Sequence, residues 1–215
     1  MNPQLLRARI LTLGSFTINF ACQLYGMLSS PNMKEVADAN HYAYSPNPIF
    51  IAAFFSLQIL LQLYWIRKLF VASSANESPK YEHRVTLPGG ISETDPATLA
   101  PSENPNEPEP AQMAYGPIYA LGNICIAGWM VFWMQGWFWA SQALVTINTM
   151  IQLYAVFCLL GPSSPFALST SNVSTHLVAK TFAGIGVLDF LDNGAVATVF
   201  ISYSGILTIT LMFKL

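Results

Sequence analysis

Residues 138–160 read FWASQALVTINTMIQLYAVFCLL, a run in which no position carries a charged side chain. The hydrocarbon core of a bilayer is about 30 Å thick and a helix rises about 1.5 Å per residue, so about 20 apolar residues cross it. The run is therefore long enough to cross a membrane as one helix. Gly161 and Pro162 follow it directly and predict where that helix ends.

Similar runs precede this one in the chain. They cover residues 10–28, 49–66 and 118–134. Over the whole chain 53% of the residues are hydrophobic and only 9% are charged, against about 25% charged in a soluble domain. This composition excludes an ordinary soluble enzyme and a nucleic-acid-binding protein, and it indicates that membrane lipid surrounds the chain.

A last apolar run extends from residue 175 to 213 and is too long for one crossing. Asp192-Asn193-Gly194 interrupts it with residue types that favour turns. We therefore predict two short helices, 175–190 and 195–213. The expected fold class is all-α, a polytopic bundle of six transmembrane helices, with five as the alternative if one of the last two lies at the membrane interface.

A polar segment, residues 73–114, separates the first two runs from the others. It carries seven acidic and two basic side chains and is rich in Pro, Ser and Asn. Such a composition cannot bury enough apolar area to offset the entropy of ordering, so we expect disorder. The predicted organisation is two spans in residues 1–72, a disordered acidic Pro-rich loop in 73–114, and four spans in 115–215.

The basic residues predict an orientation. With six spans, eight of the nine Lys and Arg residues fall on the side of the bundle that holds the N-terminus, and only Lys34 falls on the other. Loops rich in Lys and Arg stay in the cytosol. We therefore expect a multi-pass membrane protein with both termini and the 73–114 loop in the cytosol.

Amide side chains occur in pairs within three of the apolar runs. Each pair has i,i+4 spacing, which places both amides on one helical face, and each is followed directly by Leu-Tyr: Asn19 and Gln23, Gln58 and Gln62, Asn148 and Gln152. Two readings remain open. The amides either join neighbouring helices by hydrogen bonds or line a polar internal site where three helices converge.

Asp189 is the most unusual charge in the chain, because it lies inside apolar sequence together with Lys180 and Asp192. Charged groups at membrane depth are costly and often mark a functional site. Lys180 is close enough to the cytosolic end of its helix to extend its ammonium into water. Asp189 either anchors its helix at the interface or belongs to an ion, proton or ligand site.

Trp129, Trp133 and Trp137 form an i, i+4, i+8 stripe. An aromatic belt at the outer membrane interface explains this stripe, and a stacking wall for a flat apolar ligand is the alternative.

No catalytic motif, metal-ligand spacing or cofactor fingerprint occurs, so we predict no catalytic residue, no metal and no cofactor. An intramembrane enzyme would need Asp189, Asp192 and His176 to converge, and His176 lies at the opposite end of the fifth helix. Enzyme activity is therefore the least favoured function.

Three segments, YSPNP at 44–48, FFSLQ at 54–58 and KTFAGIGVLDFLDN at 180–193, resemble an uncharacterised fungal family of multi-pass membrane proteins. That resemblance implies membrane helices and no activity. The first two helices, the Pro-rich connection between them and the Trp-rich third and fourth helices also resemble the tryptophan-rich sensory proteins of translocator-protein type. Those five-helix proteins bind porphyrins and sterols, so the likeness implies a small apolar ligand. The long loop and the sixth helix depart from that family.

The function expected is binding or transport of a small apolar or amphipathic molecule in a polar-lined cavity of the bundle. Its predicted lining is the amide set with one carboxylate at the outer mouth: Asn19, Gln23, Gln58, Gln62, Asn148, Gln152 and Asp189. The alternative is a non-catalytic membrane scaffold that docks partners through the 73–114 loop.

Overall fold

The structure is a computed structural model that describes residues 3–40, 48–71 and 109–212, and over these residues it contains helices and turns but no strand. The all-α prediction is confirmed. Residues 73–108 of the predicted loop lie outside the described residues, so the structure does not bear on the scaffold function predicted for that loop. Of the YSPNP motif, only Pro48 is described. The helices are α1 (Pro3–Leu28), α2 (Met33–Ala39), α3 (Pro48–Val71), α4 (Pro110–Met134), α5 (Phe138–Tyr154), its π-helical continuation (Ala155–Leu159), and α6 (Val173–Met212).

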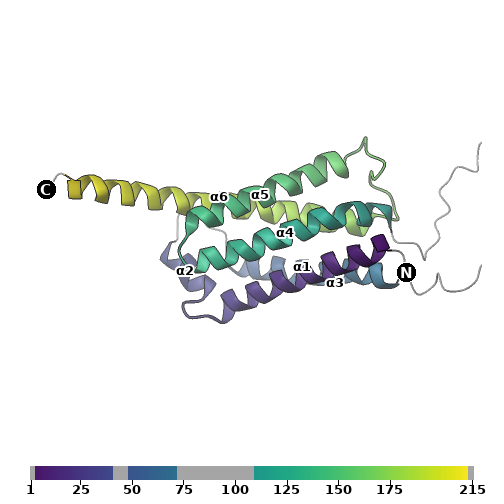
Figure 1. The fold of residues 1–215 in the computed structure, drawn as a ribbon, viewed down its shortest axis with the longest axis horizontal. Coiled ribbons are helices and arrows are strands. Elements are labelled where there is room, and N and C mark those ends of the chain that lie inside the picture. The colour runs from purple at the N-terminus through teal and green to yellow at the C-terminus, as the bar shows by residue number, and fades with distance from the viewer. Residues whose placement is uncertain (1–2, 41–47, 72–108, 213–215) are drawn as a thin grey trace, which may run out of the picture.

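The contacts between the five long helices close a ring in the order α1, α4, α5, α6, α3. Figure 1 shows these helices from the side, lying roughly along one axis. The most extensive packing is that of α4 against α1 and α5, and of α5 against α6. The short helix α2 covers one end of the bundle and contacts both α1 and α4. In Figure 1 the far end of α6 extends well beyond the other helices.

Among the described residues, three helices are long and apolar enough to cross a membrane: Ala53–Val71, Pro110–Met134 and Phe138–Leu159. These helices indicate a membrane protein. Helix α4 begins at Pro110, so residues 110–114 are helical although we expected them in the loop. Proline suits the first helical turn because its missing N–H has no partner there in any helix.

The turn expected at Asp192-Asn193-Gly194 does not exist. Helix α6 continues through these residues as one element of 40 residues, so the prediction of two short helices is wrong and the sixth helix is absent from the described chain. As a result, the start of α1 and the end of α6 lie at opposite ends of the molecule (Figure 1).

Asn193 explains why the helix does not break there. Its side chain is 2% exposed and its amide is fully used by neighbouring helices. The Oδ1 atom accepts hydrogen bonds from Trp129 Nε1 at 3.2 Å and from the Ser141 hydroxyl, while Nδ2 donates to Gln142 Oε1 at 2.7 Å and to the Phe138 carbonyl. An asparagine engaged in this way cannot bond its own backbone, which is what favours turns.

The tryptophan stripe divides between the core and the surface. Trp129 and Trp133 are buried, at 8% and 4% exposure, whereas Trp137 is 57% exposed. The belt interpretation is therefore wrong for the first two, which pack in the interior next to Asn193 and Phe138. Between α4 and α5 the chain turns at Gly136, whose φ of +72° is a conformation that residues with a Cβ rarely adopt.

The second half of helix α3 is anchored by buried side chains and by polar contacts to other elements. Trp65 and Leu69 are completely buried, and Trp65 Nε1 donates to Thr175 Oγ1 at 2.8 Å. At the end of the helix Lys68 Nζ lies 3.1 Å from Glu109 Oε2, and Arg9 donates to the Leu69 carbonyl at 2.8 Å. The described part of the first half has no apolar side chain that is fully buried.

A pair of matched substitutions tests the role of Asn193. Asn193→Leu leaves Trp129, Ser141 and Gln142 without their partner in the interior, so we expect it to lower the free energy of unfolding by about 1–3 kcal/mol. Asn148 is equally buried, but within the described chain its amide has no hydrogen-bond partner. Asn148→Leu should therefore be neutral or slightly stabilising. Thermal unfolding in one detergent measures both, and equal losses would contradict this account.

Candidate functional site

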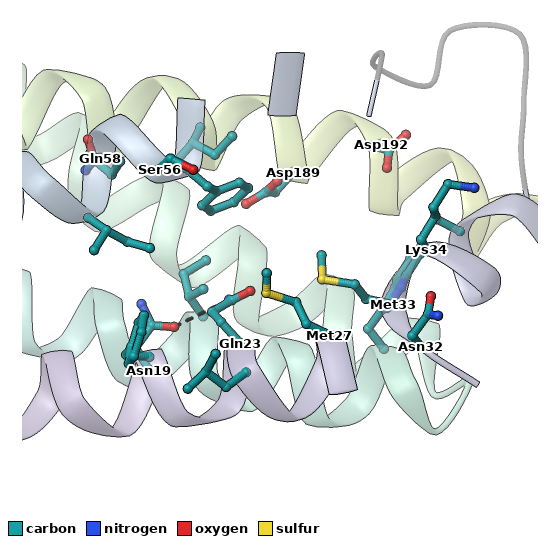
Figure 2. A pocket seen from close by; sticks show the side chains of 18 of the residues that line it. Asn19, Gln23, Met27, Asn32, Met33, Lys34, Ser56, Gln58, Asp189 and Asp192 are labelled. Atoms are coloured by element: carbon teal, nitrogen blue, oxygen red, sulfur yellow. Dashed lines mark hydrogen bonds between the residues drawn. The ribbon is translucent and has the colours of Figure 1, made fainter. Parts of the chain in front are cut away.

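A cavity of about 620 Å³ lies between α1, α3 and α6, with α4 behind it and α2 at its outer end (Figure 2). Helix α3 contributes five residues from its middle part to the wall: Phe55, Ser56, Gln58, Ile59 and Gln62. A volume of this size is typical of sites for small organic molecules.

Most of the cavity wall is apolar. Two methionines, Met27 and Met33, lie near its outer end, where α1 leads into α2 (Figure 2). The other large apolar side chains on the wall are Phe16, Phe20, Leu24, Phe55, Ile59, Ile126, Trp133, Phe182, Ile185 and Val196. A ligand that fills this space must therefore present a mainly apolar surface.

On the α1 side the polar groups are tied to one another and to α4. Gln23 Nε2 donates to Asn19 Oδ1 at 3.5 Å, and Asn19 Nδ2 donates to Asn123 Oδ1 at 2.7 Å. Asn123 is completely buried and donates in turn to the carbonyl of Tyr119. The amides of α1 are thus held in place on the wall before any ligand arrives.

On the α3 side the two glutamines differ. Gln62 is 5% exposed and its Oε1 accepts a hydrogen bond from the Tyr119 hydroxyl. Gln58 lies one turn nearer to α2 and is 4% exposed, yet within the described chain neither Oε1 nor Nε2 has a hydrogen-bond partner. Burying an amide without a hydrogen-bond partner lowers the free energy of unfolding by about 1–3 kcal/mol. A ligand that bonded to the donor or the acceptor of Gln58 would recover part of that cost.

Carboxylates lie towards the outer end. Asp189 and Asp192 project from α6 at i,i+3 spacing and both line the cavity, and Figure 2 shows Asp189 on the wall across from Gln23. On α2, Lys34 Nζ forms a 2.5 Å ion pair with Asp38. The hydrogen bond to Asp38 and the negative charge of Asp38 raise the pKa of the Lys34 ammonium above its ordinary value. Both side chains therefore stay ionised, and their opposite charges give the pair no net charge.

The structure brings five of the seven predicted site residues to one cavity, namely Asn19, Gln23, Gln58, Gln62 and Asp189. It does not bring Asn148 and Gln152 there. These two lie in the packed interior between α4, α5 and α6, where Gln152 Oε1 accepts from the Tyr115 hydroxyl at 2.8 Å. A Cβ atom added to Gly122 of α4 would collide with both amides, so that glycine makes the space they occupy.

Sequence reasoning missed the residues of α4 that hold the amides. Tyr115, Tyr119 and Asn123 stand at i, i+4 and i+8, so they form one polar stripe on a mainly apolar helix. That spacing was a usable signal. Their partners lie on three different helices, and no pattern within one helix identifies those partners.

His176 and Lys180, the other residues considered from sequence, lie away from Asp189. His176 is buried near the start of α6, where its Nε2 lies 2.9 Å from the Phe166 carbonyl, and it is four turns of helix from Asp189. Lys180 is exposed. Within residues 3–40, 48–71 and 109–212, no group of three or more His, Cys, Asp or Glu side chains is placed to hold a metal ion.

Comparisons with known proteins give no family for the chain. No family model, no curated protein and no solved structure matches it. Both resemblances therefore remain predictions.

Two tyrosines of α4 test how the amides are held. Tyr119→Phe removes the hydroxyl that Gln62 accepts from, and Tyr115→Phe does the same to Gln152. Each change should lower the free energy of unfolding by about 1 kcal/mol, because a buried acceptor loses its donor. The control is Tyr64→Phe on the 55%-exposed surface of α3. Thermal unfolding in one detergent compares the stability of the three variants. If Tyr119→Phe unfolds at the same temperature as the control, the hydrogen bond from Tyr119 does not stabilise the bundle.

Proposed function

We propose that the chain is an integral, multi-pass membrane protein that binds a small amphipathic molecule in the cavity between α1, α3 and α6. The observation that carries this proposal is Gln58, a buried amide on the wall of a ligand-sized apolar cavity, whose donor and acceptor find no partner among the residues that the structure describes. A bound molecule with one polar group satisfies that amide while its apolar body fills the remaining volume.

The outer surface of the bundle supports the membrane location. Large apolar side chains on the outer faces of α3, of α5 and of its π-helical continuation are strongly exposed, among them Leu57 at 67%, Met150 at 67% and Phe157 at 72%. A monomer in water rarely exposes a continuous apolar surface of this kind. Lipid around the bundle covers these side chains.

The orientation follows from the basic residues at the two ends. Arg7, Arg9, Arg67 and Lys68 lie at the end of the bundle where the chain begins, and Lys34 lies at the other end on α2. The positive-inside rule places the first end in the cytosol. Because α6 is one continuous helix, five crossings replace six, and the C-terminal end of α6 lies outside rather than in the cytosol.

The cavity itself favours binding over a purely structural role. If its amides served only to join helices, each would have a partner in a neighbouring helix, as Gln62 has in Tyr119. Gln58 has none within the described chain, although it is buried on the cavity wall. A polar group of a bound molecule would supply the partner that the neighbouring helices do not.

A double variant that narrows the cavity tests the proposal. The cavity variant, Ile59→Trp with Ile185→Trp, places two larger side chains on the cavity walls formed by α3 and α6. The control, Leu60→Trp with Leu177→Trp, places the same side chains on exposed faces of the same two helices. Mass spectrometry of small molecules retained by the purified full chain should find a species in the wild type and the control. Its amount should fall at least tenfold in the cavity variant.

Identical extracts from the three proteins would overturn the proposal, provided that gel filtration shows each to be folded. Recovery of bulk membrane lipid alone, in equal amounts from all three, would do the same.

The orientation is tested with protease sites. A site inserted between residues 73 and 108 and one placed before Met1 should be cut only from the cytosolic side of sealed vesicles. A site placed after Leu215 should be cut only from the opposite side. Cleavage of all three from one side would contradict the five-crossing arrangement and would support an even number of crossings.

A further inference from the structure

We infer that the cavity selects a neutral primary carboxamide or lactam, a group that carries an N–H donor and a C=O acceptor side by side on one edge. This inference rests on the proposed function, since it names the class of ligand for the same site. It depends on the hydrogen-bonding capacity of Gln58, on the partners of the neighbouring amides and on the apolar remainder of the wall.

Gln58 offers the cavity a complete amide. Its side chain is 4% exposed and lines the cavity, and neither Oε1 nor Nε2 forms a hydrogen bond with any residue that the structure describes. The last torsion of a glutamine side chain is broad, so the amide can turn towards a group in the cavity without a movement of α3. A ligand that fills the cavity therefore meets one donor and one acceptor together.

Each of these two atoms needs a partner of the opposite kind. An ammonium group only donates and a carboxylate or ester only accepts, so each of these leaves one atom of Gln58 without a hydrogen bond. A hydroxyl does both, but through a single oxygen. A primary carboxamide or a lactam carries its N–H and C=O on one edge and forms two parallel hydrogen bonds with Gln58, the two-point geometry that makes bidentate pairs specific. A trans secondary amide carries them on opposite edges and cannot do this.

The other amides that α1 and α3 contribute to the wall already have partners. Gln23 Nε2 donates to Asn19 Oδ1, and Gln62 Oε1 accepts from the Tyr119 hydroxyl. These side chains do not need a ligand to complete their hydrogen bonds. One polar group on the ligand is therefore enough, and it pairs with Gln58.

The remainder of the wall determines the body of the ligand. In Figure 2 Gln58 lies towards one end of the cavity, whereas Met33 lies towards the other end, beside α2. Phe20, Leu24 and Met27 of α1 also line the wall. Methionine thioethers are polarizable and adapt to irregular apolar shapes. A ligand whose carboxamide pairs with Gln58 therefore extends an alkyl or aryl body towards the methionines.

Three neutral probes with the same alkyl chain test the inference on the purified full chain in lipid nanodiscs. They are dodecanamide, methyl dodecanoate and dodecan-1-ol, and because none is charged, no formal charge contributes to the differences between them. Binding is referred to the concentration of each probe in the lipid, which empty nanodiscs measure. We expect dodecanamide to bind at least fivefold more tightly than the ester and the alcohol, because only the carboxamide pairs with both atoms of Gln58.

Variants locate the group that makes the selection. Gln58→Leu removes both hydrogen-bonding atoms, so it should weaken dodecanamide binding at least fivefold and change methyl dodecanoate binding less than threefold. Gln58→Met makes the same change with an unbranched side chain, which keeps the test open if Gln58→Leu fails to fold. The matched control is Asn148→Leu, which removes an equally buried amide that has no described partner and does not line the cavity. It should leave the preference for the carboxamide unchanged.

The outcomes separate this inference from the proposed function. If the ester or the alcohol binds as tightly as dodecanamide, or if the preference persists without Gln58, the inference is overturned and the small-molecule site stands. The same holds if Asn148→Leu removes the preference as fully as Gln58→Leu does. If no probe binds while the cavity-narrowing variant loses a retained molecule, the ligand belongs to another class and the inference is again overturned. If no probe binds and that variant retains what the wild type retains, the proposed function is overturned as well.

Discussion

The structure depends on one constraint, which is that polar groups inside an apolar helix bundle must find partners in neighbouring helices. Helix α4 meets this need with a single stripe. Asn123 accepts from Asn19 of α1, Tyr119 donates to Gln62 of α3, and Tyr115 donates to Gln152 of α5. These hydrogen bonds fix the rotation of α1, α3 and α5 about their axes and their position along α4. Helix α4 therefore helps to determine how α1, α3 and α5 are arranged around it.

Against this background the two amides without described partners are informative, and they differ in their surroundings. Asn148 is enclosed by packed side chains and by Gly122 and Gly186, so no ligand reaches it. Gln58 lies on the wall of a cavity large enough for an organic molecule. A missing hydrogen bond is therefore only a loss of stability at Asn148, whereas at Gln58 a ligand can supply it. The two positions differ because there is space for a ligand beside Gln58 and none beside Asn148.

The all-helical fold followed from apolar run length. Among the candidates that line the cavity, Asn19, Gln23, Gln58 and Gln62 followed from i,i+4 spacing, and Asp189 followed from a charge inside apolar sequence. The other two site residues, Asn148 and Gln152, could not be excluded from sequence, because spacing places both on one face of a helix but does not give the order of helices around the ring. The predicted turn at Asn193 failed for a related reason. Local propensity favours a break there, and hydrogen bonds from α4 and α5 outweigh it.

The length of α6 has a mechanical consequence. Its 40 residues measure about 60 Å at about 1.5 Å per residue, roughly twice the hydrocarbon thickness. Asn193 clamps it near the middle, one turn from Asp189, and about 28 Å of rod remains between that clamp and Met212. A tilt of about 10° at Asn193 would therefore move the tip by about 5 Å but Asp189 by only about 1 Å, because the two lie at very different distances from the clamp.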